Sequence, residues 1–230
     1  NLRLKAGGKD GAITLAPLAA GLYDGTITVN GEIDARPDTP KIHLTESTKG
    51  IQLGPLFRDL SGKEEMTGRA DISADLTSRG LTRSELTRNS NGTVKLLVAD
   101  GAIAKLQILE TIRTANILLG AASGRSATAT AAEAASKTSA GEQGAGRPTT
   151  FTHLTASGVL QNGVFRNDDL LAESELMRVT GAGTVDLVSE RIDYLLTVTL
   201  AKEIASSGQT GLANLTDTPI PYRVRGTFDR

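Results

Sequence analysis

Several residue types that common protein functions need are scarce or missing in this chain of 230 residues. It has no cysteine, which excludes disulfides, thiol catalysis and cysteine-ligated zinc. It has no tryptophan and only 3% aromatic residues, which argues against base-stacking platforms and aromatic cages, because both need several exposed rings. The 25 basic and 26 acidic residues nearly cancel, so no overall positive field favours nucleic acid or an anionic membrane. No apolar run is long enough to span a bilayer.

Sequence motifs of common enzymes are also missing. The phosphate loop G-x-x-x-x-G-K-S/T, the dinucleotide motif G-x-G-x-x-G after a strand, the nucleophile elbow G-x-S-x-G and the zinc motif H-E-x-x-H do not occur. The only histidines, His43 and His153, lie in strand-like runs, where pairing with a neighbouring side chain is a better explanation than metal binding or general-base catalysis. We therefore expect no enzymatic activity, no cofactor and no metal site.

The densest group of carboxylates lies around residues 167–175. Oxygen-rich clusters can bind calcium, but this one lacks the spacing and the glycine of an EF-hand loop. We interpret it as a solvated turn, because Asp and Asn favour turns. Its members are Asn167, Asp168, Asp169, Glu173 and Glu175.

Apolar and polar residues alternate with a period of two along almost the whole chain, in stretches of roughly eight to ten residues separated by Gly or Asn-Gly, as in antiparallel strands. In one example Ile27, Val29 and Ile33 share a face while Glu32 and Asp34 lie on the other. The pattern predicts roughly ten strands in a mainly β protein, and it predicts a hairpin turn at 91–92.

Two segments break the alternation and predict helices. Pro55 stands at a first-turn position, and the apolar residues that follow predict one or two helical turns over 54–60. The stretch 104–119 has one apolar helical face and could cap an open end of the sheet or lie in its concavity. Residues 121–148 contain no large apolar residue, so we expect a mobile low-complexity linker there.

The apolar strand faces could form an ordinary sandwich core or could line a trough. The helices are too few to cover ten strands, so either the sheet folds onto itself or something else occupies its apolar face. We favour a single antiparallel sheet curved into a trough or half-pipe. The residues that we predict to line its groove are Ile72, Leu96, Val98, Leu187, Tyr194, Leu196 and Val198.

The order of short motifs from Leu53 to Asp229 resembles that of the AsmA family of bacterial envelope proteins, in the C-terminal part of its region outside the inner membrane. The match includes Pro-Leu-Phe-Arg-Asp-Leu at 55–60, Gly-Arg-Ala-Asp-Ile at 68–72 and Asn-Gly-Thr-Val at 91–94. It continues with Asp-Gly-Ala-Ile at 100–103 before a helix, Gly-Ala-Gly-Thr-Val-Asp-Leu at 181–187 and Arg-Gly-Thr-Phe at 225–228.

The resemblance implies a β-taco-like periplasmic domain of a protein that an upstream segment anchors in the inner membrane. The chain begins without Met and within an alternating pattern at residues 2–4, so we expect residues 1–230 to be one β-rich domain and a fragment of a longer polypeptide. The resemblance also implies kinship with bridge-like lipid transfer proteins. The expected partners are phospholipids, the inner membrane and outer-membrane or envelope proteins, but not nucleic acid. The expected function is to shelter acyl chains in an apolar groove during transport between the two membranes. The alternative is a structural module that supports outer-membrane protein assembly without touching lipid.

Overall fold

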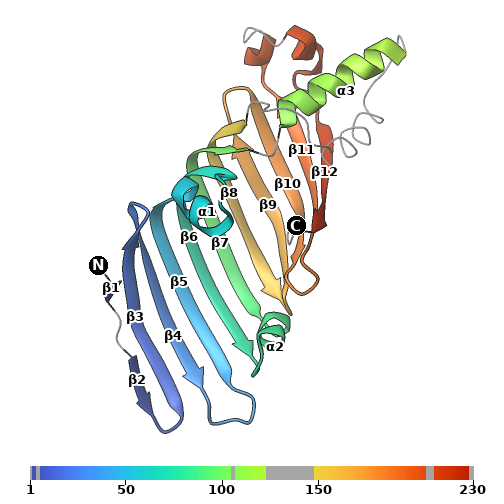
Figure 1. Ribbon diagram of the computed structural model, residues 1–230. Helices are drawn as coiled ribbons and strands as arrows, with labels where there is room; N and C mark the ends of the chain where they lie inside the picture. Colours follow the sequence, from blue (N-terminus) through green and yellow to red (C-terminus); the bar gives the residue numbers. More distant parts are fainter. Residues whose placement is uncertain (1, 4–5, 105–106, 123–147, 206–209, 228–230) are drawn as a thin grey trace.

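The computed structural model describes residues 2–3, 6–104, 107–122, 148–205 and 210–227, and most of them form one antiparallel sheet of twelve strands (Figure 1). The sheet is not closed into a barrel. The strands are β1 (Leu2–Arg3), β2 (Ala6–Lys9), β3 (Ala12–Leu22), β4 (Gly25–Asp34), β5 (Lys41–Gln52), β6 (Met66–Arg79), β7 (Asn91–Ile103), β8 (Thr149–Gln161), β9 (Val164–Glu173), β10 (Met177–Asp186), β11 (Arg191–Leu200) and β12 (Ile220–Thr227).

The strand order follows the chain. From β3 to β12 each strand pairs antiparallel with the next, and β1 and β2 both pair with β3. Even β7 and β8 are direct neighbours, although a helix and the segment 123–147 separate them in sequence. The predicted curved antiparallel sheet is confirmed.

The register places the apolar residues of successive strands on one side of the sheet, which we call the apolar face. Side chains alternate between faces, so residues that are paired across strands share a face. One row of paired residues runs from β3 to β12 and is built almost entirely from apolar residues and glycine: Leu15, Gly31, Leu44, Leu76, Gly92, Leu160, Phe165, Val185, Ile192 and Gly226.

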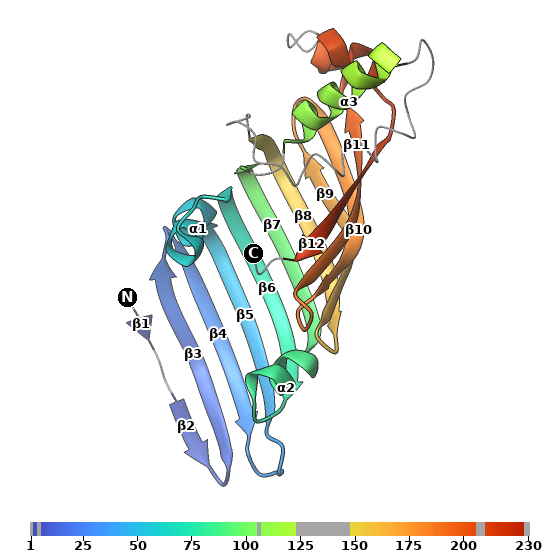
Figure 2. The same ribbon diagram turned by 45° about the vertical axis from the view of Figure 1, so that its right-hand side comes forward.

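The sheet curls around the apolar face. In the turned view β12 passes in front of β8 and β9, on the same side as helix α1 (Leu53–Ser61) (Figure 2). Leu53, Leu56 and Phe57 of α1 pack with residues of the apolar face such as Ala70 and Val98. The apolar face is therefore the concave inner side of the sheet.

The remaining helices lie at the ends of the strands. Helix α3 (Ile108–Ala122) and the 3-10 turns η1 (Lys202–Ala205) and η2 (Thr210–Leu215) gather at the upper ends of β10 to β12, where Ile108, Ile112 and Leu212 are buried in a second core cluster (Figure 1). Helix α2 (Arg83–Arg88) lies at the lower end, in the connection from β6 to β7. Among the described residues, none of the helices has the length and hydropathy needed to cross a membrane.

The two predicted helices are confirmed with shifted bounds. α1 extends the predicted 54–60 by one residue at each end, and the left-handed Gly62 (φ 74°) ends it by donating its N–H to the carbonyl of Arg58. α3 starts four residues later than predicted. The predicted mobile linker at 121–148 overlaps the end of α3, and nearly all of the rest lies outside the described residues.

The predicted hairpin turn at 91–92 is wrong. Asn91 lies in β7, opposite Thr77 of β6, and the connection before it contains α2. A capping box begins that helix: Thr82 accepts from the backbone N–H of Glu85, and the Glu85 carboxylate accepts from the N–H of Thr82.

Candidate functional site

Among the described residues, the elements that cover the apolar face pack at its upper end. α1 packs over the upper parts of β5 to β8, and α3 with η1 and η2 packs over β10 to β12. Farther down the strands, a group of half-buried side chains belongs to neither core cluster. We call this group the open region, and it consists of Leu15, Ile33, Ile42, Leu44, Leu76 and Val94.

The groove residues predicted from sequence fall in three different surroundings. Ile72 and Leu96 are paired across β6 and β7 and lie half-buried at the border of the α1 cluster. Leu187 follows the end of β10 in a turn and is 38% exposed. The others are on the apolar face but lie within the core clusters: Val98, Tyr194, Leu196 and Val198.

The sequence prediction missed the open region. The sequence does contain a signal for the open region, because Ile42 and Leu44 of β5 and Leu76 of β6 follow the alternating pattern. What the pattern could not indicate was the position of α1 and α3, which remove the upper parts of the face from solvent.

The two core clusters border a small apolar cavity of about 80 Å³. Phe151 and Leu154 of β8 line it from the α1 cluster, and Ile108, Met177 and Leu196 line it from the α3 cluster. This volume is much smaller than that of a typical ligand pocket, which is about 300–1,000 Å³.

The opposite, convex face of the sheet is polar and carries cross-strand ion pairs. Asp193 of β11 accepts from Arg223 Nε at 2.9 Å and from Arg225 Nε at 3.1 Å, and these two guanidinium groups lower the pKa of Asp193 to about 2. Lys49 Nζ lies 2.9 Å from Asp71 Oδ2, which lowers the pKa of Asp71. These charged side chains allow the convex face to remain exposed to solvent.

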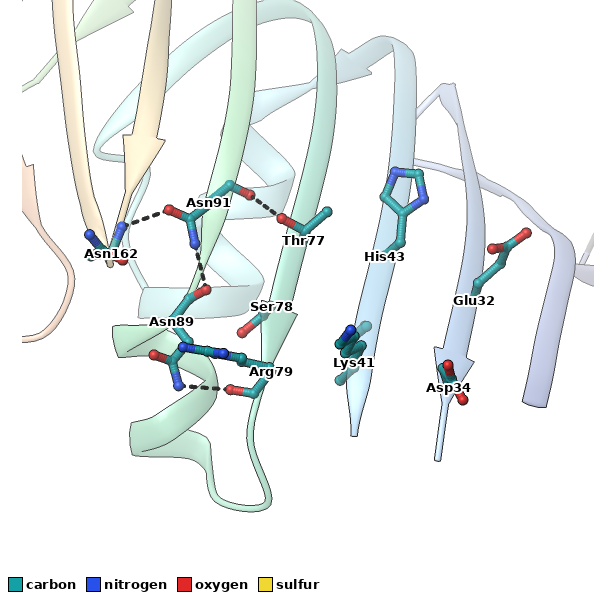
Figure 3. Close-up of a pocket in the computed structure, with 11 residues that line it drawn as sticks. Glu32, Asp34, Lys41, His43, Thr77, Ser78, Arg79, Asn89, Asn91 and Asn162 are labelled. Carbon is teal, nitrogen blue, oxygen red and sulfur yellow. Dashed lines mark hydrogen bonds between the residues drawn. The ribbon is translucent and has the colours of Figure 1, made fainter. Parts of the chain in front are cut away.

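An open pocket of about 520 Å³ lies on the polar face over β4 to β7 (Figure 3). His43 is in its wall and places Nε2 2.8 Å from Asp75 Oδ1, as expected for a histidine that pairs with a neighbour. Asp34 is already bound by Arg36, with Nε at 2.7 Å from Oδ1. Among the described residues, no group of three or more His, Asp and Glu side chains is arranged to hold a metal ion.

The carboxylate cluster at 167–175 lies mainly in strand β9 and the interpretation as a turn is wrong. The register with both neighbouring strands shifts just after Asn167, which marks a β-bulge within this segment. There the Asp169 carboxylate accepts from the backbone N–H of Ser157 at 2.7 Å and from its hydroxyl, and these bonds lower the pKa of Asp169. The carboxylate thus takes over hydrogen bonds that the bulge removes from the ladder.

Asn167 is the one strongly polar side chain buried within the β9 to β11 part of the apolar face, with 1% exposure. Its Nδ2 donates to the Ser157 carbonyl and to Asp169 Oδ1, both at 2.6 Å, while Oδ1 has no partner in the structure. Its neighbours across the sheet are Gly158 and Gly183. A Cβ atom at these glycines would collide with the ring of Phe165 at position 158 and with that of Tyr194 at position 183.

Comparison with known proteins gives one consistent result. The model of the AsmA family matches residues 1–170. Protein AsmA of Escherichia coli K12 is 20% identical over 223 residues, and AsmA family protein YhjG of the same organism is 26% identical over 221 residues. Each match covers 96% of this chain but only 33% and 28% of the relatives, so the chain spans a third of their length or less. No solved structure matches it significantly.

Proposed function

This chain belongs to the AsmA family, and from that premise we propose that it is a lipid-binding and lipid-conducting segment of an envelope protein. In this proposal the chain faces the periplasm and shelters phospholipid acyl chains on its apolar face during transport between the inner and outer membranes. The observation that carries the proposal is the apolar face itself, which continues across all paired strands and which neither core cluster of the described residues covers in the open region.

The dimensions of the open region suit an acyl chain. It extends from Leu15 of β3 to Val94 of β7, which are four strand spacings apart, or about 19 Å at about 4.8 Å per spacing. An acyl chain is about 15 Å long, half of a hydrocarbon core about 30 Å thick. One or a few chains can therefore lie against these strands.

Burial of the acyl chain supplies the binding energy without any catalytic group. Each buried CH₂ contributes about 0.8 kcal/mol, so even partial contact with the open region favours a lipid over water. The headgroup can stay hydrated along the open side of the curled sheet. The proposed function therefore includes no enzymatic activity.

A matched pair of charge insertions on β5 tests the proposal. The chain is incubated with phospholipid vesicles, separated from them and extracted, and the lipid it retains is measured by mass spectrometry. We expect wild-type protein to retain phospholipid and Leu44→Asp to retain little, because an unpaired carboxylate among acyl chains costs several kcal/mol. Ser47→Asp places the same charge on the exposed polar face of the same strand and should leave retention unchanged.

Circular dichroism of both variants establishes that the sheet is still folded. If the wild-type chain retains no phospholipid, or if folded Leu44→Asp retains as much as wild type, the apolar face does not serve lipid. A structural module for outer-membrane protein assembly then becomes the better explanation.

A further inference from the structure

One acidic side chain interrupts the apolar face. Among the strand positions that the register aligns on this face, Glu46 of β5 is the only one with a charged side chain. It lies in the row next to the one that contains Leu44, between Val29 of β4 and Ala74 of β6. The row runs across the sheet through Leu18, Val29, Glu46, Ala74, Val94, Gly158, Asn167, Gly183, Tyr194 and Val224.

A neighbouring hydroxyl holds the Glu46 carboxylate on this face. Thr48, two residues along β5 and therefore on the same side, donates its hydroxyl proton to Glu46 Oε1. Thr48 is only 3% exposed, between Ile27 and Ile72, so its position is set by packing. Glu46 itself is half-buried, and its paired residue on β6 is the small Ala74.

The described part of the chain supplies no cation to this carboxylate. No Lys, Arg or His nitrogen of the described residues lies within ion-pair distance of Glu46. The adjacent cation in sequence, Lys49, is on the polar face and pairs with Asp71 there. The cations of the sheet lie on the polar face, as Arg223 and Arg225 do.

An amphiphile that covers the open region would remove water from around Glu46. A carboxylate that loses its water is strongly disfavoured unless a hydrogen-bonded cation replaces that water. Acyl chains cannot do this, and an anionic headgroup would add repulsion. A primary ammonium group can donate hydrogen bonds to the free lone pairs of the carboxylate while its acyl chains lie against Leu44 and Leu76.

We propose that Glu46, held by Thr48, is a subsite for the ammonium group of an amphiphile, so that the apolar face prefers phospholipids with a primary amine in the headgroup. The inference rests on the proposed lipid-binding function and specifies its substrate class. Glu46 acts in it as a specificity residue, while the apolar side chains supply the bulk of the affinity.

Competition between two headgroups tests this subsite. The 230-residue chain is incubated, in buffer with a chelator, with vesicles of equal phosphatidylethanolamine and phosphatidylglycerol, and the ratio of the two lipids retained is measured by mass spectrometry. We expect wild type to enrich phosphatidylethanolamine roughly tenfold, the change expected for one charge-assisted hydrogen bond. Glu46→Gln keeps an acceptor for Thr48 and should lower the ratio to near one with total lipid unchanged.

Glu32→Gln is the matched control, because Glu32 is an exposed carboxylate on the polar face of the neighbouring strand β4. It should keep the wild-type ratio. Equal ratios in wild type and Glu46→Gln, with lipid retained by both, would overturn the ammonium subsite and leave lipid binding intact. A loss of preference in Glu32→Gln as large as in Glu46→Gln would also overturn it, since the effect would then come from surface charge in general. Absence of any retained lipid would instead refute the proposed function.

Discussion

Tyr194 of β11 lies across Gly183 of β10, its paired residue on the neighbouring strand. A Cβ atom at position 183 would come within 2.6 Å of Tyr194 Cγ and within 2.4 Å of the Asp193 carbonyl oxygen. Tyr194 can therefore occupy this position only because residue 183 has no side chain.

The first prediction follows from this contact. Gly183→Val is expected to reduce the free energy of unfolding by about 1–3 kcal/mol, the usual cost of forcing extra atoms into a packed region. Urea unfolding monitored by circular dichroism measures it. Gly226→Val is the control, because Gly226 also pairs with a residue of β11 but a Cβ there meets nothing within 4 Å. Similar losses in the two variants would contradict the steric explanation.

The second prediction compares two leucines on the apolar face. Leu196 is 7% exposed within the cluster below α3, whereas Leu44 is half-buried in the open region. Leu196→Ala should lower the free energy of unfolding by about 2–5 kcal/mol, because it leaves a cavity in a packed core. Leu44→Ala should lower it by clearly less, since none of the described helices packs above it. Chemical denaturation of both variants decides this, and equal losses would mean that the open region is core.

The third prediction concerns acid stability. The pKa of Asp193 is about 2 in the folded protein, held down by Arg223 and Arg225, against about 3.9 in an unfolded chain. Because the folded-state pKa is the lower one, the stabilisation from this pair is present above about pH 4 and is lost as the pH falls toward 2.

Asp193→Asn removes the titrating group and serves to isolate this contribution. The difference in stability between wild type and Asp193→Asn, measured by thermal unfolding from pH 6 down to pH 2, should shrink over that acidic window. It should also shrink with added salt, because the three side chains are exposed. A difference that stays constant through pH 4 to 2 would show that the ion pair is not its source.

The fourth prediction concerns the buried amide of Asn167. Asn167→Ala removes the two hydrogen bonds from Nδ2 and leaves the Ser157 carbonyl without this donor, which should cost about 1–3 kcal/mol of stability. Asn30→Ala, at an exposed position in β4, should change stability by less than about 0.5 kcal/mol. Native-state hydrogen exchange should localise the loss to β8 and β9; a loss spread evenly over the sheet would contradict a local role.

Local signals in the sequence were sufficient for several elements. Pro55 followed by apolar residues predicted α1, and the alternation predicted the strands on either side of it. The short helix α2 was overlooked although Thr82 and Glu85 have the spacing of a capping box. The bulge at Asp169 could not be predicted, because it depends on how β9 pairs with both β8 and β10.

The candidate site was only partly predictable, because it too depends on which elements pair and pack together. Val98 and Leu44 have similar positions in the alternating pattern, yet the first is fully buried and the second is open. Glu46 was visible in sequence as a charged residue in an apolar position, but only the register shows that it interrupts an otherwise uncharged row of paired strand residues.

The amino-acid sequence alone determined that this protein is a two-faced antiparallel sheet, because side chains alternate along a strand and a period of two therefore sorts them onto opposite faces. Only the tertiary structure decided which part of the apolar face stays open. That depends on where α1 packs beside β6 and on where α3 packs against β10 to β12, far along the chain. Such tertiary contacts leave no periodic signal in the sequence.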